Sequence, residues 1–513
     1  MPADRGGGSA VALAGALGLV HAVSLSVPGL WWLQLAVFTG LCVLLRTSTW
    51  TRATVSERTA IRRWASTGFA FGFTGFLAGI GWLFISMHRY GEMPAPLAAS
   101  ALILFCGYLA MFPALACGLS ATTRNSSSFI RTAILASSFT LTELLRGSLF
   151  TGFPWLSPGY AHADGPFSSI APWLGVYGVG LFATALAAVI AEAILRASAG
   201  GKGMWGLAGT AVTIVVIAAS AGAVRWVTPQ PTALRVDLAQ GNVPQDLKFN
   251  PQRALAAMHA YIAALQPGRA DLVVLPETAW TLPWSQTPPA LAAQLRQALG
   301  EETVAAVGMP LPSQSDPRLF TNSIGVVDGR GMLIARYDKR HLVPFGEFIP
   351  AGFGWFVAMM KIPLGEFSRG SENQPLLRVA GSSVAFNICY EDLFGGELAE
   401  QVRSGANILV NASNIAWFGD SHAQAQHLEI SRMRALEFAR PMLRATNTGV
   451  TAAIDHQGRV VSQLPGYREG VLSLTITPTA GLTPYARTGD KLIWLLVLAM
   501  LALGWLSHRR VAR

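Results

Sequence analysis

The sequence has few charged residues and few cysteines for its length. Only 13% of its 513 residues are charged, whereas 51% are hydrophobic, and the mean hydropathy is +0.40. An ordinary soluble domain carries about 25% charged residues, so this composition argues against one and predicts membrane insertion. The chain also lacks a Walker-type phosphate loop, which argues against an energy-coupled pump.

Eight apolar segments are candidates for membrane helices, which need about 20 mostly apolar residues each. The predicted spans are 9–27, 30–45, 65–87, 96–120, 129–145, 170–195, 204–224 and 492–506. The first segment also reads as a cleaved signal peptide. An equally apolar segment follows it at once, and this favours a retained span.

Arginine and lysine gather in the connections after the second, fourth and sixth spans and at the C-terminus. With eight spans, all four basic regions lie on one side, which the positive-inside rule identifies as the cytoplasm. Both termini are then cytoplasmic, and the long segment 227–490 is periplasmic. The net charge of +10 follows from this topology, so we expect no nucleic-acid partner.

Residues 227–490 have the pattern of a folded domain. Short β-type runs such as "ALRVDLAQG", "ADLVVLPE" and "SVAFNICYE" alternate with helical stretches, and "VVDGRG" and "IDHQGR" are typical of hairpin turns. This mixture predicts an α/β domain whose sheets are covered by helices. We therefore divide the chain into a seven-helix membrane domain (1–226), a periplasmic α/β domain (227–490), for which a catalytic role is argued below, and a C-terminal helix with a basic tail (491–513).

One of the four cysteines stands apart from the others. Cys42, Cys106 and Cys117 lie in predicted spans, whereas Cys389 lies in the extracytoplasmic domain, where it has no partner for a disulfide. An unpaired thiol in an oxidising compartment is a candidate reactive group. A buried structural cysteine is the alternative, and the spacing alone leaves both open.

A reactive thiol needs a base or a positive neighbour. None of the histidines of the domain ends a β-type run. Glu277 in "LVVLPETAW" does, and Lys339 in "ARYDKRHLVPFGEF" also follows such a run. These side chains can meet Cys389 at one edge of a sheet, although each is also compatible with an exposed loop charge.

The stretches "LPETAW", "YDKRHLVPFGEF" and "NICYEDLF" together resemble the nitrilase-type Glu-Lys-Cys hydrolases. The resemblance implies an αββα sandwich in which Glu277 is the general base, Lys339 stabilises the oxyanion and Cys389 is the nucleophile. It gives supporting roles to three further residues: Glu347, Tyr390 and Glu391. A capping or ion-paired carboxylate is the alternative for both glutamates. Because an acid beside Cys389 raises the pKa of its thiol, we expect Lys339 to outweigh Glu391.

The presence of a nitrilase-like domain and membrane spans in one chain narrows the choice of family. Such a domain between seven spans and one is similar to the apolipoprotein N-acyltransferase family, and "TELLRG", "TGFPWLSPGY" and "RALEFARPMLRATNTG" agree. The family implies a bacterial inner-membrane enzyme, expected as a monomer and without a cofactor. Cys389 would take an acyl group from a phospholipid, with phosphatidylethanolamine expected, and pass it to the α-amino group of a diacylglyceryl apolipoprotein. We expect no metal, since His422 and His427 are five apart, off the usual helical zinc spacing.

Access to lipid is predicted from aromatic and apolar residues. The segment 351–364, "AGFGWFVAMMKIPL", is too apolar for a solvated loop, so it is either a lid in the membrane interface or a short core helix. The predicted lipid contacts are Trp355, Phe356, Met359, Met360, Trp417 and Phe249, the last at a place where relatives often carry tryptophan. In the membrane domain, Glu143 and Arg146 are spaced to pair on one helix face.

Two other function classes remain open. A membrane-anchored nitrilase-type amidase acting on a small amide keeps the three catalytic residues, but it leaves eight spans and an apolar lid without a use. A non-enzymatic transporter or receptor makes Cys389 structural, although a transporter would need more charge within its spans.

Overall fold

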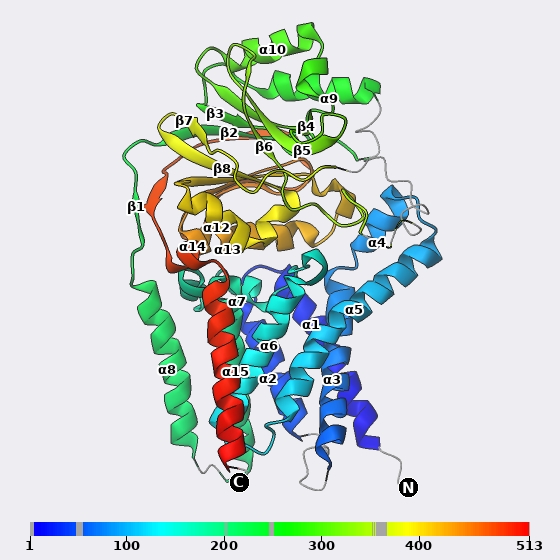
Figure 1. The fold of residues 1–513 in the computed structure, drawn as a ribbon, viewed down its shortest axis with the longest axis vertical. Coiled ribbons are helices and arrows are strands. Elements are labelled where there is room, and N and C mark those ends of the chain that lie inside the picture. Colours follow the sequence, from blue (N-terminus) through cyan, green and yellow to red (C-terminus); the bar gives the residue numbers. More distant parts are fainter. Residues whose placement is uncertain are drawn as a thin grey trace. The chain divides into compact units, whose positions relative to one another are not determined.

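The computed structural model describes residues 5–47, 55–200, 203–245, 251–350, 352, 354 and 367–511. Two units can be distinguished in the chain (Figure 1). The helical unit comprises Met1–Gly81, Ala99–Arg225 and Thr488–Arg513, and the sandwich unit comprises Trp82–Ala98 and Trp226–Arg487.

The predicted spans coincide with long helices of the described chain. These are α1 (Arg5–Ser26), α2 (Trp31–Thr47), α3 (Glu57–Gly79), α5 (Ala95–Ala121), α6 (Ser128–Arg146), α7 (Ala171–Ser198), α8 (Met204–Gly222) and α15 (Lys491–Val511). Within the described residues, five helices are long and apolar enough to cross a membrane, and α3 with its bent continuation makes a sixth. The apolar helices fit a membrane protein, while the number of eight spans stays a prediction.

The structure breaks the predicted third span, 65–87, near its end. α3 ends at Gly79, and after a bend of 58° the chain continues as α4 (Leu83–Ile85) and η2 (Ser86–Tyr90). Glycines such as Gly79 and Gly81 weaken a continuous helix and are common at kinks. Residues from Trp82 to Ala98 group with the sandwich unit, so the predicted boundary at residue 226 does not account for this segment.

Glycines allow the membrane helices to approach closely. A Cβ atom at Gly18 on α1 would lie 2.1 Å from the carbonyl oxygen of Phe71 on α3, and one at Gly68 would lie 2.4 Å from that of Pro113 on α5. Small residues at such contacts are typical of helix packing in membranes, where van der Waals contact drives association.

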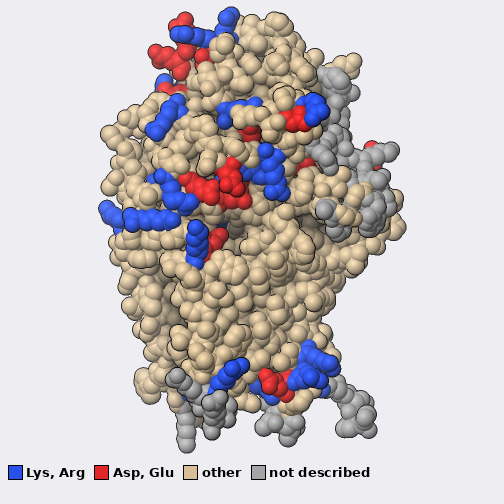
Figure 2. Space-filling model, in the orientation of Figure 1, with Lys and Arg blue, Asp and Glu red and all other residues tan. Residues whose placement is uncertain are grey.

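Charged side chains of the helical unit pair with one another. The predicted pair is confirmed, since the Arg146 guanidinium donates to the Glu143 carboxylate. At the other end of the helices, Glu192 lies 2.5 Å from Arg131 and 3.7 Å from Arg46. On the face drawn in Figure 2, the helical unit is uncharged along most of its length and carries its charges at one end.

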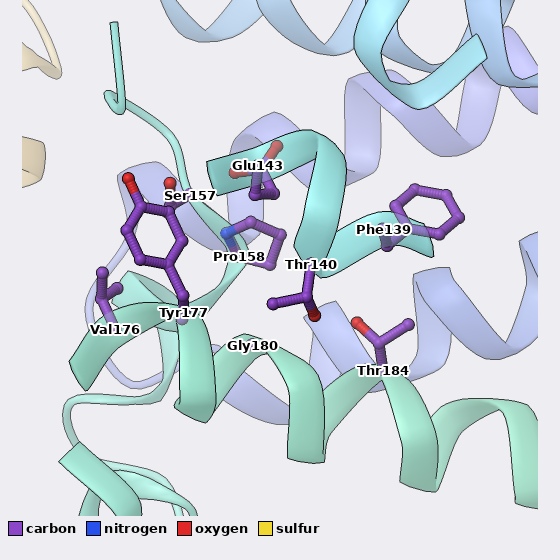
Figure 3. A pocket seen from close by; sticks show the side chains of 10 residues that line it. Phe139, Thr140, Glu143, Ser157, Pro158, Val176, Tyr177, Gly180 and Thr184 are labelled. Atoms are coloured by element: carbon purple, nitrogen blue, oxygen red, sulfur yellow. The ribbon is translucent and has the colours of Figure 1, made fainter. Parts of the chain in front are cut away.

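A small cavity lies between α6 and α7 of the helical unit (Figure 3). Glu143, Thr140 and Phe139 face it from α6, and Tyr177 and Thr184 face it from α7. None of the predicted catalytic residues lines this cavity. Glu277, Lys339 and Cys389 all lie in the sandwich unit.

Two six-stranded sheets form the sandwich unit. The first has the order β13-β2-β3-β4-β5-β6 and the second has the order β12-β11-β10-β9-β8-β7. The strands of the first are β13 (Gly470–Ile476), β2 (Leu234–Gln240), β3 (Leu272–Val274), β4 (Val304–Pro312), β5 (Phe320–Val327) and β6 (Leu333–Asp338). Those of the second are β12 (Val460–Leu464), β11 (Thr451–Ile454), β10 (Met442–Thr446), β9 (Ile408–Ser413), β8 (Ser382–Ile388) and β7 (Leu377–Val379).

Helices cover the outer face of each sheet (Figure 1). α9 (Pro251–Ala264) and α10 (Pro289–Leu299) pack on the first sheet, and α12 (Gly395–Arg403) and α13 (Ala423–Phe438) pack on the second. The inner faces meet in a core that includes Val236 of β2 and Phe386 of β8. The predicted αββα sandwich is therefore confirmed.

Alternation along the strands explains this layering. In β8, Val384 and Phe386 face the core between the sheets, whereas Ala385 faces the helices, as the two-residue period of a strand requires. Both predicted hairpins are confirmed, because β5 pairs antiparallel with β6 and β11 with β12.

Short elements complete the described chain. β1 (Val227–Pro229) pairs with β14 (Thr479–Gly481), and α14 (Pro484–Thr488) precedes α15. The 3-10 helices are η3 (Leu149–Thr151), η4 (Pro158–His162), η5 (Ser168–Ile170), η6 (Trp284–Gln286), η7 (Cys389–Leu393) and η8 (Ile415–Phe418).

Candidate active site

The three predicted catalytic residues follow the ends of three strands. Glu277 comes three residues after β3, Lys339 comes directly after β6, and Cys389 comes directly after β8. β3 and β6 belong to one sheet and β8 to the other, so the sandwich brings side chains from both sheets together. Strand ends are where open α/β sheets commonly place functional groups.

Lys339 forms ion pairs with two carboxylates. Its Nζ atom lies 3.3 Å from Glu277 Oε1 and 2.9 Å from Glu347 Oε1. The Lys339 side chain is 1% exposed. Burial lowers the pKa of the ammonium, but Glu347 and Glu277 outweigh burial and raise that pKa above its ordinary value. Lys339 therefore keeps its positive charge.

Further hydrogen bonds hold Glu277 in place. Its Oε1 atom accepts from Asn322 Nδ2 at 2.7 Å, and its Oε2 atom accepts from the backbone N–H of Asn414 at 2.8 Å. Thr278, which follows it, has a φ of +50°, so the backbone turns sharply there. The carboxylate is fixed between both sheets, because Asn322 lies in β5 and Asn414 follows β9.

Cys389 occupies a sharp turn between β8 and η7. Its φ of +52° lies in the left-handed region, which non-glycine residues rarely adopt. Burial, and next to it the charge of Glu277, raise the pKa of the thiol above its ordinary value, although Lys339 acts in the opposite sense. Burial and Glu277, rather than Glu391, thus outweigh Lys339, and the sulfur stays protonated in the resting protein.

The Glu391 carboxylate is occupied by hydrogen bonds from other groups. Its carboxylate accepts from the hydroxyl of Tyr337 at 3.0 Å and from the backbone N–H groups of Ile388 at 2.7 Å and Arg340 at 2.7 Å. Burial raises the pKa of Glu391 to about 7, although Lys339 opposes the rise. Glu391 thus connects the turn that carries Cys389 to the loop that follows Lys339.

Tyr390 packs into an aromatic cluster. The ring is buried, and its centroid lies 5.2 Å from that of Phe394 and 5.8 Å from that of His341. These contacts place the residue after Cys389 in a rigid setting.

The structure brings polar residues to the site that the sequence analysis missed. Asn322 donates to Glu347 as well as to Glu277, and Asn414 also donates to Gln245 Oε1 at 2.8 Å. His427 lies 3.3 Å from the carbonyl oxygen of Cys389. The only signal for Asn322 and Asn414 is a polar residue in or just after a strand pattern.

The segment between α3 and α5 packs near Trp417. The hydroxyl of Ser86 donates to the carbonyl oxygen of Trp417 at 2.8 Å, and the Tyr90 ring meets the Trp417 ring edge-on at 5.9 Å. Trp82 lies 4.1 Å from Phe418, ring to ring, and donates to Gln426. The other predicted lipid contacts lie outside the described residues: Trp355, Phe356, Met359, Met360 and Phe249.

The arrangement suits acyl transfer to and from a thiol. A fixed carboxylate can accept a proton, and a buried ammonium can stabilise an oxyanion, next to a sulfur in a strained turn. Among the residues that the structure describes, no group of three or more His, Cys, Asp and Glu side chains is placed to hold a metal ion.

Family models match both parts of the chain. The model of the carbon-nitrogen hydrolases matches residues 235–485, and that of the apolipoprotein N-acyltransferase N-terminal domain matches residues 17–189. Two solved structures show a distant likeness. An amidase from Nesterenkonia sp. is 19% identical with a TM-score of 0.35, covering 50% of this chain and 94% of its own. A carbon-nitrogen hydrolase from Helicobacter pylori is 16% identical with a TM-score of 0.32, and the match covers 48% of this chain and 89% of the hydrolase.

Curated relatives match over nearly the whole length. The apolipoprotein N-acyltransferase of Ralstonia nicotianae is 43% identical over 94% of this chain and 90% of its own. That of Bordetella bronchiseptica is 41% identical over 86% and 88%, and that of Nitrosomonas europaea is also 41% identical over 86% and 88%. The chain therefore belongs to the apolipoprotein N-acyltransferase family.

Proposed function

We propose that this acyltransferase moves one acyl group from a membrane phospholipid to the α-amino group of the S-diacylglyceryl cysteine of an apolipoprotein, through a thioester on Cys389. The observation that carries this proposal is the Lys339–Glu277 ion pair of 3.3 Å, placed at strand ends with Cys389 in a member of this family. The sequence identity to apolipoprotein N-acyltransferases, which extends over both parts of the chain, supports lipoprotein N-acylation as the reaction.

In the first half-reaction, Glu277 takes the proton of the Cys389 thiol as the sulfur attacks the sn-1 ester carbonyl. Because the pKa of this thiol is raised by burial and by Glu277, the proton must leave during the attack rather than before it. Lys339 and backbone N–H groups stabilise the oxyanion. The C–O bond then breaks, and Glu277 returns the proton to the departing lysophospholipid oxygen.

In the second half-reaction, the amine of the lipoprotein attacks the thioester carbonyl. Glu277 accepts a proton from the amine, the C–S bond breaks, and the sulfur regains that proton. The products are an N-acylated lipoprotein and the free thiol. A thioester is useful here because an amine captures it readily, provided that water is largely excluded from the site.

The supporting residues position the three proposed catalytic side chains and do not react themselves. Glu347 holds the Lys339 ammonium at 2.9 Å and so orients the oxyanion donor. Glu391 and Tyr390 shape the turn of Cys389, since Glu391 accepts the backbone N–H of Ile388. For Glu391 and Tyr390, a role in positioning Cys389 fits their contacts better than direct contact with the substrate.

The lipid side of the site is expected around Trp417, whose position near Tyr90 suits contact with an acyl chain. Trp355, Phe356, Met359, Met360 and Phe249 are proposed as further lipid contacts. We take phosphatidylethanolamine as the donor and a monomer as the active form. The chain would cross the inner membrane eight times, with both termini cytoplasmic and the sandwich unit periplasmic.

Intact-mass spectrometry tests the proposal. Purified wild type and Cys389→Ala are incubated with phosphatidylethanolamine in detergent, without acceptor. We expect one fatty acyl increment on the wild type alone, removed by hydroxylamine, with release of lysophospholipid. If neither the adduct nor lysophospholipid forms, the proposal fails. A small-amide hydrolase would then be tested with short-chain amides, and a non-enzymatic protein would react with neither.

A further inference from the structure

The turn that carries Cys389 needs external support. A non-glycine residue at a φ of +52° is in a sparsely populated conformation, which persists only where the surroundings hold it. Glu391 holds one side of this turn through the backbone N–H of Ile388, and the carbonyl oxygen of Cys389 is a second backbone group by which the turn can be held. The structure provides two side-chain donors for it.

Asn411 and His427 both point a nitrogen at this carbonyl. Asn411 Nδ2, on β9, lies 3.1 Å from the Cys389 oxygen, and His427 Nε2, on α13, lies 3.3 Å from it. The turn is therefore held from a strand of the second sheet and from the helix that covers that sheet.

Arg444 determines which nitrogen of His427 carries the hydrogen. Its Nη2 atom lies 2.7 Å from His427 Nδ1. Arginine has donors only, so Nδ1 accepts, and the hydrogen of the neutral ring is on Nε2. That hydrogen faces the Cys389 carbonyl and Asp392 Oδ1, which is 3.0 Å away.

The partners of His427 are themselves fixed. Asp392 Oδ2 accepts from Ser431 Oγ at 2.7 Å, and Arg444 lies 3.4 Å from the same oxygen. The side chains of His427, Asp392 and Arg444 are fully buried. Burial, and then Arg444, lower the pKa of His427, so the ring stays neutral and keeps its tautomer.

We propose that His427, oriented by Arg444 and Asp392, is a positioning residue that holds the Cys389 carbonyl and thereby aims the sulfur in both half-reactions. His427 does not serve as the base, because Nδ1 is already an acceptor for Arg444 and Nε2 donates. This inference rests on the proposed role of Cys389 as nucleophile. It adds a requirement that Glu277 and Lys339 alone do not meet, since the attacking sulfur must stay close to its reactive geometry.

Two polar substitutions at this position separate positioning from general packing. His427→Gln places an amide nitrogen near the place of Nε2, where it can donate to Cys389. His427→Asn places its amide nearer to Nδ1, too short to reach that carbonyl. Both variants keep a polar side chain beside Arg444, so a difference between them reports on the reach of the donor.

A matched control disturbs the same helix without touching Cys389. Arg432 on α13 donates to the Gly458 carbonyl at 2.8 Å and pairs with Glu429 at 2.8 Å. The Arg432→Gln variant therefore shows what a loosened α13 does by itself. The full-length chain in detergent is used throughout, and unfolding is followed for every variant.

The measurements are the first-order rate of acyl-enzyme formation at saturating phosphatidylethanolamine, the donor concentration for half-saturation, and the rate at which iodoacetamide alkylates Cys389. We expect His427→Asn to slow acylation about tenfold at unchanged half-saturation, as the loss of one buried hydrogen bond implies. His427→Gln should recover to within about threefold of the wild type, and Arg432→Gln should acylate normally.

Equal acylation rates of His427→Asn and wild type would overturn the inference, as would equal losses in His427→Asn, His427→Gln and Arg432→Gln. If His427→Asn does not fold, the comparison passes to His427→Gln alone, whose alkylation rate must then remain near that of the wild type. Failure of the wild type itself to form a thioester rejects the proposed function instead, so the two failures are distinguishable.

Discussion

Glu277 and Glu347 are joined by one amide nitrogen, because Asn322 Nδ2 donates to Oε1 of Glu277 at 2.7 Å and to Oε1 of Glu347 at 2.6 Å. Two neighbouring carboxylates repel each other and tend to bind a proton. The Asn322 amide and the Lys339 ammonium lie between them and offset this repulsion. This relationship holds the Glu277 carboxylate in a fixed position, as the proposed role of general base requires.

Removing the bridge should weaken both stability and acylation. Asn322→Ala removes one of the two donors from each of two buried carboxylate oxygens and leaves only Lys339 Nζ, so we expect a loss of about 1–3 kcal/mol in the free energy of unfolding. Acyl-enzyme formation should slow by about tenfold or more, because Glu277 loses its orientation. Mass spectrometry and thermal unfolding measure the two effects. The exposed Asn373 provides a control, and an unaffected rate in Asn322→Ala would contradict this account.

A double substitution should separate the two roles of Lys339. Lys339→Met leaves Glu277 and Glu347 facing each other without the cation, and breaking a buried pair in this way costs about 3–5 kcal/mol. Adding Glu347→Gln removes one of the charges and should restore much of that stability. Acylation should stay lost, by about 100-fold or more, in both variants because the proposed oxyanion donor is absent. Recovery of activity in the double variant would show that Lys339 is needed only for folding.

The pH dependence of stability should report on Glu391. Its folded-state pKa is raised to about 7 by burial, so the folded protein binds more protons than the unfolded chain between the ordinary pKa of a glutamate and pH 7. The contribution of Glu391 to the free energy of unfolding should therefore be greatest below about pH 4.5. It should fall by about 3 kcal/mol as the pH rises to 7. Glu391→Gln should flatten the slope in that window. Unfolding curves at several pH values test this, and an unchanged slope would rule it out.

A glycine in β4 should prove intolerant to a side chain. A Cβ atom at Gly308 would lie 2.3 Å from the carbonyl oxygen of Pro276 and 2.7 Å from Glu277 Cα. Gly308→Ala should displace the turn that carries Glu277, the proposed base, and slow acylation by about tenfold or more. Gly209→Ala on α8, where nothing lies within 4 Å, is the matched control. Normal acylation in Gly308→Ala would mean that the turn of Glu277 can shift freely.

The sequence predicts the site where a chemical group ends an apolar strand. Glu277, Lys339 and Cys389 are detectable for this reason, and the alternation in β8 predicts its two faces. Asn322 is not detectable in this way, because its function depends on β5 lying beside both carboxylates. His427 is hidden as well, since α13 is buried along nearly its whole length and shows no polar face against which a histidine stands out.

Hydropathy also fails at the end of α3. A window average does not register a bend of 58°, and the residues after the bend are apolar enough to extend a predicted span. Whether such residues continue a helix or join another unit depends on contacts that are distant in sequence, such as that of Trp82 with Phe418.

The placement of Trp82–Ala98 has a practical consequence for cutting the chain. A fragment that starts at Trp226 and stops at Arg487 would omit Trp82, Ser86 and Tyr90. These residues pack against Trp417 and Phe418. Such a fragment would expose aromatic surface and invite aggregation. A fragment that retains the segment through a short linker should be the more soluble of the two.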